Sequence, residues 1–307
     1  MEEAMHPAIS VNNLTKKYKE KSVVDALSFD IEKGSIMGLL GPNGAGKTTT
    51  LKMLTHLINK TTGEILINNL SLEAHPKQAL QMVGASLDTP AFYNEFTALE
   101  NLSYIAKLHE NISTQKITQL LELVGLSAET TKKVRHYSLG MKQRLALARA
   151  LIHEPKIVIL DEPANGLDPQ GMRKLYQLIR SLALEKQVTF IISSHQLSDM
   201  EELCTDVMIL NKGKAILHGK TKELIQSTND SIILSLEDSQ KAFNWLQASP
   251  QIDLIDQHES DFHIQLKDIS FDTFLKQLAA SGLVIQRLSI KQKSLEDLFV
   301  ELTEGWD

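Results

Sequence analysis

The sequence predicts an α/β domain with a largely parallel sheet, followed by a smaller α+β domain. Up to about residue 220, strand-sized apolar runs alternate with helical stretches, as they do in α/β proteins. After a polar segment at residues 226–230, the order of elements becomes βαββαβ, which is typical of a ferredoxin-like sandwich. We therefore expect one domain at residues 1–225 and a second at residues 230–307.

Each element is expected from a short apolar run and the residues that end it. In the first domain we expect strands at 36–40, 157–160 and 189–193, a hairpin over 207–219 that turns at 211–214, and a short helix at 221–225. In the second domain we expect strands at 232–236, 252–256, 262–266 and 284–290, and helices at 242–248, 271–280 and 295–302. Phe271, Phe274, Leu275 and Leu278 share one helical face, which we interpret as core rather than as a ligand site.

Composition and charge restrict the function. No apolar run approaches the length of a bilayer span, and the first residues lack the features of a signal peptide, so we expect a cytoplasmic location. The net charge of -6 is uneven, because residues 221–307 carry 15 acidic against 7 basic side chains. An acidic tail and a nearly neutral first domain argue against a nucleic-acid partner. Cys204 is the only cysteine, which excludes an intrachain disulfide and favours a buried structural thiol.

One segment carries most of the predicted chemistry, and it follows the apolar strand at residues 36–40. It has the pattern G-x-x-x-x-G-K-T in full and continues into a helix: Gly41, Pro42, Asn43, Gly44, Ala45, Gly46, Lys47 and Thr48, followed by Thr49. Glycines let backbone amides approach phosphate oxygens at a helix start, Lys47 supplies a charge for the β and γ phosphates, and Thr48 supplies a hydroxyl for Mg²⁺. A chance glycine-rich turn is the weaker interpretation. The sequence thus predicts a binding site for ATP and Mg²⁺.

A second apolar strand ends in two carboxylates, Asp161 and Glu162. Acids at the carboxyl end of a buried strand are typical of a site, and here Asp161 is expected to hold Mg²⁺ while Glu162 accepts a proton from the attacking water. Alone, the pair could equally be a solvated acidic turn. The phosphate loop upstream favours the catalytic interpretation.

Between these motifs, Ser138, Leu139, Gly140 and Met141 open a helix that runs to about His153. A serine N-cap and a glycine in the first turn offer amides and a dipole end, which makes a second phosphate-binding surface. One γ phosphate does not need two such surfaces in one chain, so a head-to-tail homodimer with ATP between opposite chains is the economical interpretation. The set of motifs resembles the ATP-binding subunits of ATP-binding-cassette (ABC) transporters over residues 8–220, with Leu139 in place of the first glycine of the family's signature.

The resemblance implies an ABC-type P-loop ATPase fold with a helical subdomain at about residues 88–154, and roles for further residues. Tyr18 matches the aromatic residue that stacks on adenine, Asp168 closes a loop that crosses the dimer interface, and His195 matches the switch histidine that contacts the γ phosphate. Taken singly, Tyr18 would more often be ordinary packing, and a histidine at a strand end is usually structural.

One position departs from most relatives. Asp88 stands where the family usually has a glutamine that reaches Mg²⁺ and senses the membrane partner, so Asp88 is a further candidate metal ligand. Exporters that protect bacteria from lantibiotics and bacitracin-like peptides resemble this chain in having an acidic residue there. The apolar residues Pro90–Tyr93 and Phe96 follow, and we leave open whether they receive a helix of a membrane subunit or form a local core.

These observations favour an ATPase that dimerises and powers a separate membrane permease from the inner face of the membrane. Peptide-antibiotic resistance or immunity is the favoured role. Exporters of lipid, ion or polysaccharide are the alternative within transport, and a non-transport cassette ATPase or a nucleotide sensor is the alternative outside it. The second domain carries no catalytic cluster that would choose among them.

Overall fold

The computed structural model describes residues 6–88, 91–110, 112–226, 231–258, 261–267, 269–291 and 294–303. By their contacts, the elements form two compact units that divide between Lys220 and Thr221. The short helix α8 (Thr221–Gln226), which the sequence assigned to the first domain, has its contacts with the second unit. None of the described helices combines the length and the apolar character that a bilayer crossing requires.

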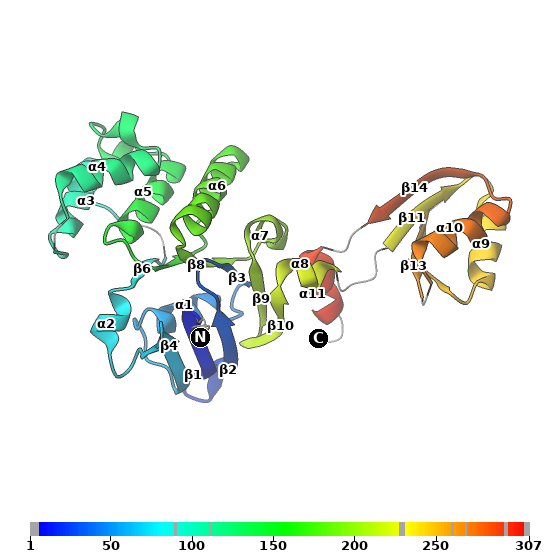
Figure 1. Ribbon diagram of the computed structural model, residues 1–307, viewed down its shortest axis with the longest axis horizontal. Helices are drawn as coiled ribbons and strands as arrows, with labels where there is room; N and C mark the ends of the chain where they lie inside the picture. The colour runs from blue at the N-terminus through cyan, green and yellow to red at the C-terminus, as the bar shows by residue number, and fades with distance from the viewer. Residues whose placement is uncertain are drawn as a thin grey trace, which may run out of the picture. The chain divides into compact units, whose positions relative to one another are not determined.

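A six-stranded sheet forms the centre of the first unit, in the order β10-β9-β3-β8-β7-β6 (Figure 1). Its members are β3 (Ile36–Leu40), β6 (Val83–Ser86), β7 (Ile157–Asp161), β8 (Thr189–Ser194), β9 (Asp206–Asn211) and β10 (Lys214–Lys220). All pairs are parallel except β9 with β10, which is the predicted hairpin. The strands read as continuous apolar runs because both faces of the sheet are covered. Helices α6 (Pro169–Lys186) and α7 (Leu197–Leu203) join the later strands.

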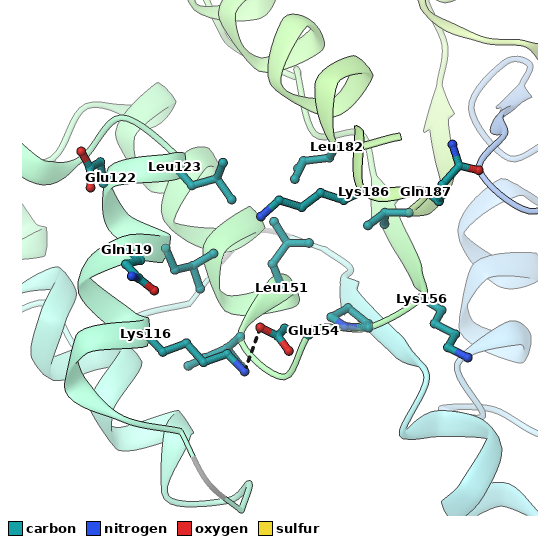
Figure 2. A pocket seen from close by; sticks show the side chains of 14 residues that line it. Lys116, Gln119, Glu122, Leu123, Leu151, Glu154, Lys156, Leu182, Lys186 and Gln187 are labelled. Atoms are coloured by element: carbon teal, nitrogen blue, oxygen red, sulfur yellow. Dashed lines mark ion pairs between the residues drawn. The ribbon is translucent and has the colours of Figure 1, made fainter. Parts of the chain in front are cut away.

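The helical subdomain consists of α3 (Ala98–Ala106), α4 (Thr114–Leu123) and α5 (Leu139–Leu151), which form a group beyond β6 (Figure 1). Each helix starts at a hydroxyl N-cap, and Thr97 and Glu100 form a complete capping box at α3. The three helices share a core of their own, which includes Leu102, Leu121 and Leu145. Between this group and the end of α6 lies a pocket (Figure 2).

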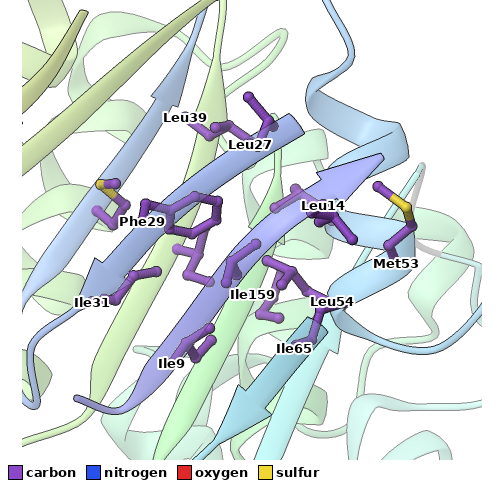
Figure 3. Packing of buried hydrophobic residues seen from close by; sticks show 14 of the residues in the cluster. Ile9, Leu14, Leu27, Phe29, Ile31, Leu39, Met53, Leu54, Ile65 and Ile159 are labelled. Atoms are coloured by element: carbon purple, nitrogen blue, oxygen red, sulfur yellow. The ribbon is translucent and has the colours of Figure 1, made fainter. Parts of the chain in front are cut away.

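A second, antiparallel sheet has the order β2-β1-β4-β5 and covers α1 (Lys47–Leu54). Its strands are β1 (Ile9–Tyr18), β2 (Lys21–Ile31), β4 (Thr62–Ile67) and β5 (Leu70–Ser71), and the short α2 (Pro76–Leu80) follows. The main core lies between this sheet, α1 and the parallel sheet, where Leu14, Leu54 and Ile159 meet (Figure 3). This packing holds the start of α1 against the carboxyl ends of the parallel strands.

The second unit has the predicted ferredoxin-like order, with strands arranged β12-β13-β11-β14 and all pairs antiparallel. After α8, its elements are β11 (Ser231–Leu236), α9 (Ser239–Ala248), β12 (Ile252–His258), β13 (Asp261–Leu266), α10 (Phe271–Ala280), β14 (Ile285–Lys291) and α11 (Leu295–Thr303). Phe274 and Leu278 of α10 are fully buried against the sheet, as their spacing predicts. Phe271 and Leu275 pack at the margin of the same core.

Cys204 is 6% exposed and lies beside Met200, in agreement with the predicted structural thiol. Burial raises the pKa of this thiol far above its usual range, so it stays protonated and unreactive.

Candidate functional site

The phosphate loop, Gly41–Thr48, joins β3 to α1 and depends on two glycines for its shape. Gly41 has φ +138°, and a Cβ built on it would lie 2.2 Å from the carbonyl oxygen of Leu210. Gly44 has φ +82°, and a Cβ there would meet nothing within 4 Å. Gly41 therefore allows the loop to pass close to β9, whereas Gly44 faces open space into which a ligand can enter.

Helix α1 begins without a side-chain cap. Its N-cap residue is Gly46, which has a left-handed backbone conformation and no side chain that could accept a hydrogen bond from an amide of the first turn. The amides of the first helical turn are therefore free to bind an external anion, and the helix dipole adds to that attraction. The sequence predicts that phosphates bind at this helix start.

Lys47 is 6% exposed although it is charged. Its ammonium donates to the carbonyl oxygens of Gly41 at 2.7 Å and Pro42 at 3.3 Å, and lies 3.5 Å from Oε1 of Glu162. A buried ammonium needs such partners to offset its lost hydration. Lys47 thus connects the phosphate loop to the acidic end of β7.

One hydrogen-bond network joins the first turn of α1 to the ends of β7 and β8. Thr48 Oγ1 donates to Asp161 Oδ2 at 2.8 Å, Ser193 Oγ donates to Asp161 Oδ1, and the Glu162 amide donates to Ser193 Oγ at 2.9 Å. Strand β8 lies between β3 and β7, and its Ser193 is the register partner of Asp161. Ser193 is fully buried and was not singled out from the sequence.

Glu162 has a left-handed backbone with φ 48°, which costs energy for a residue with a Cβ and directs its side chain away from the line of β7. Its Oε2 lies 2.8 Å from Nδ1 of His195, while Oε1 faces Lys47. The two side chains are 23% and 42% exposed, so water reaches the pair. A carboxylate between an ammonium and an imidazole is held in a fixed position and keeps one open side.

The residues fit a Mg²⁺ ion. Thr48 Oγ1 and the Asp161 carboxylate converge within 2.8 Å, and both are the hard oxygen donors that this ion prefers. No group of three or more histidine, cysteine, aspartate or glutamate side chains suited to a metal occurs in the described part of the chain. A site completed by phosphate oxygens and water does not require one.

The element Ser138–Met141 opens α5, where Ser138 Oγ accepts the Met141 amide at 3.3 Å. It lies against the loop before α6, because a Cβ on Gly166 would be 2.7 Å from Leu139 Cδ2. At the end of that loop Asp168 caps α6 by accepting the Gly171 amide at 3.0 Å. Within the described residues, no hydrogen bond or ion pair joins Ser138–Met141 to the phosphate loop.

Two predicted residues lie apart from this network. Tyr18 ends β1, is 51% exposed, and has the Lys16 ammonium 4.8 Å above its ring centroid. Asp88 pairs with Lys52 at 3.0 Å and has 65% of its side chain exposed. Lys52 follows Thr48 by one turn of α1, so Asp88 lies near the same helix face but does not contact the Thr48–Asp161 pair. Pro90 lies outside the described residues.

A glycine-rich loop and two acids at the carboxyl ends of parallel strands define a P-loop nucleotide-binding protein. The ABC transporter family profile matches residues 24–165, and the profile "ATP-binding protein DrrA1-3-like, C-terminal domain" matches residues 219–303. The chain belongs to the ATP-binding proteins of ABC transporters, and it is an ATPase.

Three relatives illustrate the similarity. The bacitracin transport ATP-binding protein BcrA of Bacillus licheniformis is 38% identical over 98% of this chain and 99% of its own length. The lantibiotic transport ATP-binding protein SrtF of Streptococcus pyogenes is 38% identical over 68% of this chain and 89% of its own. A solved ATP-binding subunit of an ABC transporter superposes with a TM-score of 0.65 at 25% identity, covering 96% of this chain and 99% of the other.

Proposed function

We propose that this chain hydrolyses ATP to drive the export of peptide antibiotics through a separate membrane permease, to which it binds at the cytoplasmic face of the membrane. The observation that supports the proposal most is the convergence of five side chains at the start of α1 and the ends of β7 and β8: Lys47, Thr48, Asp161, Glu162 and His195. It occurs in a chain whose full-length relatives include a bacitracin transport protein. The convergence supports hydrolysis, and the relatives support the cargo.

The phosphate loop binds the β and γ phosphates through the uncapped amides of α1 and the Lys47 ammonium. Thr48 and Asp161 hold Mg²⁺, which, when bound, neutralises charge on the phosphates. The exposed ring of Tyr18 stacks on the adenine. Two roles are predicted for Asp88, namely metal binding and coupling to the permease. Its ion pair with Lys52 favours coupling.

Glu162 accepts the proton of the water that attacks the γ phosphate. Lys47 and His195 hold its carboxylate from two sides, at 3.5 Å and 2.8 Å. His195 therefore orients the base as well as contacting the phosphate. This arrangement favours an enzyme over a nucleotide sensor, since a sensor needs no positioned base.

The chain works as a head-to-tail homodimer. Ser138–Met141 present a capped helix start that does not contact the phosphate loop of the same chain. Leu139 is 42% exposed, which is unusual for a leucine and consistent with a surface that a second chain covers. In the dimer this element completes the ATP site of the partner, and Asp168 shapes the loop that crosses the interface.

The segment after Asp88 divides into a packed residue and an exposed cluster. Phe92 packs against the helical core, and the Arg149 guanidinium lies 5.1 Å from its ring centroid. Tyr93 is 53% exposed and packs against two other exposed rings, with centroids 5.2 Å from Phe96 and 5.3 Å from Tyr104. We assign the Tyr93 cluster to permease docking and Phe92 to the local core. Phe92→Ala should lower stability, whereas Tyr93→Ala should mainly weaken permease binding.

The test compares, in the source cell, the lethal concentrations of a panel of peptide antibiotics and of unrelated drugs. The strains carry the intact protein, a deletion, Glu162→Gln, or the control Glu185→Gln, which changes an exposed glutamate on α6. We expect selective sensitivity to peptide antibiotics in the deletion and in Glu162→Gln, at equal protein levels. No selective change would reject this cargo and favour a lipid, ion or polysaccharide exporter. A Glu162→Gln strain as resistant as the intact strain would favour a sensor.

A further inference from the structure

A pocket of about 660 Å³ opens where the helical subdomain meets the sheet core. It is lined by α4, the end of α5 and the segment after it, the end of α6 and the two residues that precede β8, and we call it the α4–α6 pocket. It shares no residue with the phosphate loop or with the acids of β7. Its volume lies in the range of about 300–1,000 Å³ that small organic ligands occupy in proteins.

The floor of the α4–α6 pocket is apolar. Leu151 and Leu182 are buried, Leu123 is 36% exposed, and the three side chains face one another in Figure 2. They belong to three different helices, so the floor is formed by packing between the two layers and not by one helix face. An apolar ligand that covers this floor removes hydrocarbon surface from water.

The rim of the pocket is polar and carries an excess of positive charge, because three lysines and two glutamates line it. The Lys186 side chain extends from α6 across the pocket above Leu151 (Figure 2), and no carboxylate among the described residues lies within ion-pair distance of its ammonium. Lys116 and Glu154 pair at 3.2 Å on the other side and neutralise each other. Glu122, Lys156 and Lys186 also line the pocket, and no ion pair is found for them among the described residues. Of these three side chains, that of Lys186 extends over the leucine floor (Figure 2).

We propose that the α4–α6 pocket binds a small amphipathic carboxylate, with its hydrocarbon chain on the leucine floor and its carboxylate at Lys186. A neutral chain leaves the ammonium without a partner, and a cationic one is repelled by it. A small polar anion gains nothing from the floor. Because the ligand touches α4 and α6 together, it stabilises the packing of the helical subdomain against the sheet core.

The experiment uses the full chain and decanoate, below the concentration at which it forms micelles, followed by calorimetric titration and by the thermal unfolding midpoint. Decanol and decyltrimethylammonium have the same chain with a neutral and a positive head. We expect saturable binding of one decanoate per chain, a raised unfolding midpoint, and weaker binding of the other two probes. Lys186→Ala should weaken decanoate binding about three- to tenfold, as for a partly exposed ion pair.

Matched variants separate the pocket from other effects. Lys174→Ala removes an exposed lysine of the same helix and should leave decanoate binding unchanged. Leu123→Asp places a negative charge on the floor at a partly exposed position, and should abolish decanoate binding while ATP binding persists. Lys47→Ala should retain decanoate binding. Equal affinity for decanoate and decanol, no effect of Lys186→Ala, or loss of binding in Lys47→Ala would each overturn the proposal.

Discussion

Ser193 is the residue whose removal tests the site most directly. Its hydroxyl donates to the Asp161 carboxylate and accepts the Glu162 amide at 2.9 Å, and the side chain is fully buried. Ser193→Ala removes both bonds and leaves the backbone strands in place. If Ser193 positions the two acids, this single change should affect stability and hydrolysis together.

The magnitude follows from the two bonds. A hydrogen bond to a charged group contributes about 1.5–3 kcal/mol, and a buried amide left without a partner costs about 1–3 kcal/mol. Asp161 keeps the hydrogen bond from the Thr48 hydroxyl, which limits the loss at the carboxylate. We therefore expect the free energy of unfolding to fall by about 2–4 kcal/mol. If about 1.4 kcal/mol of the lost interaction energy had stabilised the transition state of hydrolysis, kcat falls about tenfold.

The assay measures denaturant unfolding and ATP hydrolysis at saturating Mg²⁺ and ATP, with Ser194→Ala as the matched control. Ser194 is the next residue and is 6% exposed, and among the described residues its hydroxyl hydrogen-bonds only to backbone groups of Gln196. It should lower stability without lowering kcat in proportion. The positioning argument fails if Ser193→Ala hydrolyses ATP at the unaltered rate, or if both variants lose the same factor in kcat.

Three further predictions concern other parts of the first unit. Gly41→Ala should lower the free energy of unfolding by about 2–4 kcal/mol, because φ is positive there and the new Cβ would lie 2.2 Å from the Leu210 carbonyl oxygen. Gly44→Ala should lower it by only about 1 kcal/mol, because a Cβ at Gly44 meets no atom within 4 Å. Equal losses for the two variants in denaturant titrations would contradict this expectation. His153 should make the fold acid-sensitive. Burial, with a smaller effect of the stacked His109, holds its pKa below 6.5, and its Nδ1 has no hydrogen-bond partner among the described residues. The unfolded chain therefore binds more protons than the folded chain as the pH falls below 6.5, and the free energy of unfolding decreases. His153→Gln should flatten the decrease in unfolding free energy over that range, and an unchanged slope would exclude His153 as its source. Asp88→Gln should retain ATP binding and change the free energy of unfolding by less than about 0.5 kcal/mol, because its ion pair with Lys52 is exposed. It should alter the amount of substrate that the permease complex transports per ATP hydrolysed. An unaltered ratio would show that Asp88 has no role in coupling.

The parallel sheet was predictable because its strands are continuous apolar runs bounded by motifs. The antiparallel sheet of β1, β2, β4 and β5 was not expected, and β1 shows the reason. Ile9 and Val11 are both buried at odd-numbered positions, but the next buried apolar residue is Leu14, at an even-numbered position. The change occurs because the pairing register with β2 shifts between Val11 and Leu14. Asn13 has φ 49° at that point. A bulge of this kind breaks the two-residue alternation on which strand prediction depends.

The acids and the phosphate loop could be found from sequence because each motif contains its own chemistry. Ser193 could not, because its role depends on strand order. Only the placement of β8 between β3 and β7 sets its hydroxyl between Asp161 and the Glu162 amide. The signal in the sequence is a serine at the end of an apolar strand, a position that serine also occupies in proteins without any such site.

The contact of Leu139 with Gly166 has a consequence for the kinetics of the whole assembly. The loop that contains Gly166 continues directly from Glu162, and Leu167 lies against Gly140 as well. A glycine in place of Leu139 would have no side chain with which to make this contact. In the proposed head-to-tail dimer, each chain contributes Glu162 to one ATP site and the start of α5 to the other. A displacement of Glu162 in the first site is transmitted through Leu139 to the start of α5 in the second. The two ATP molecules would then be hydrolysed interdependently, and the rate would depend sigmoidally on ATP concentration.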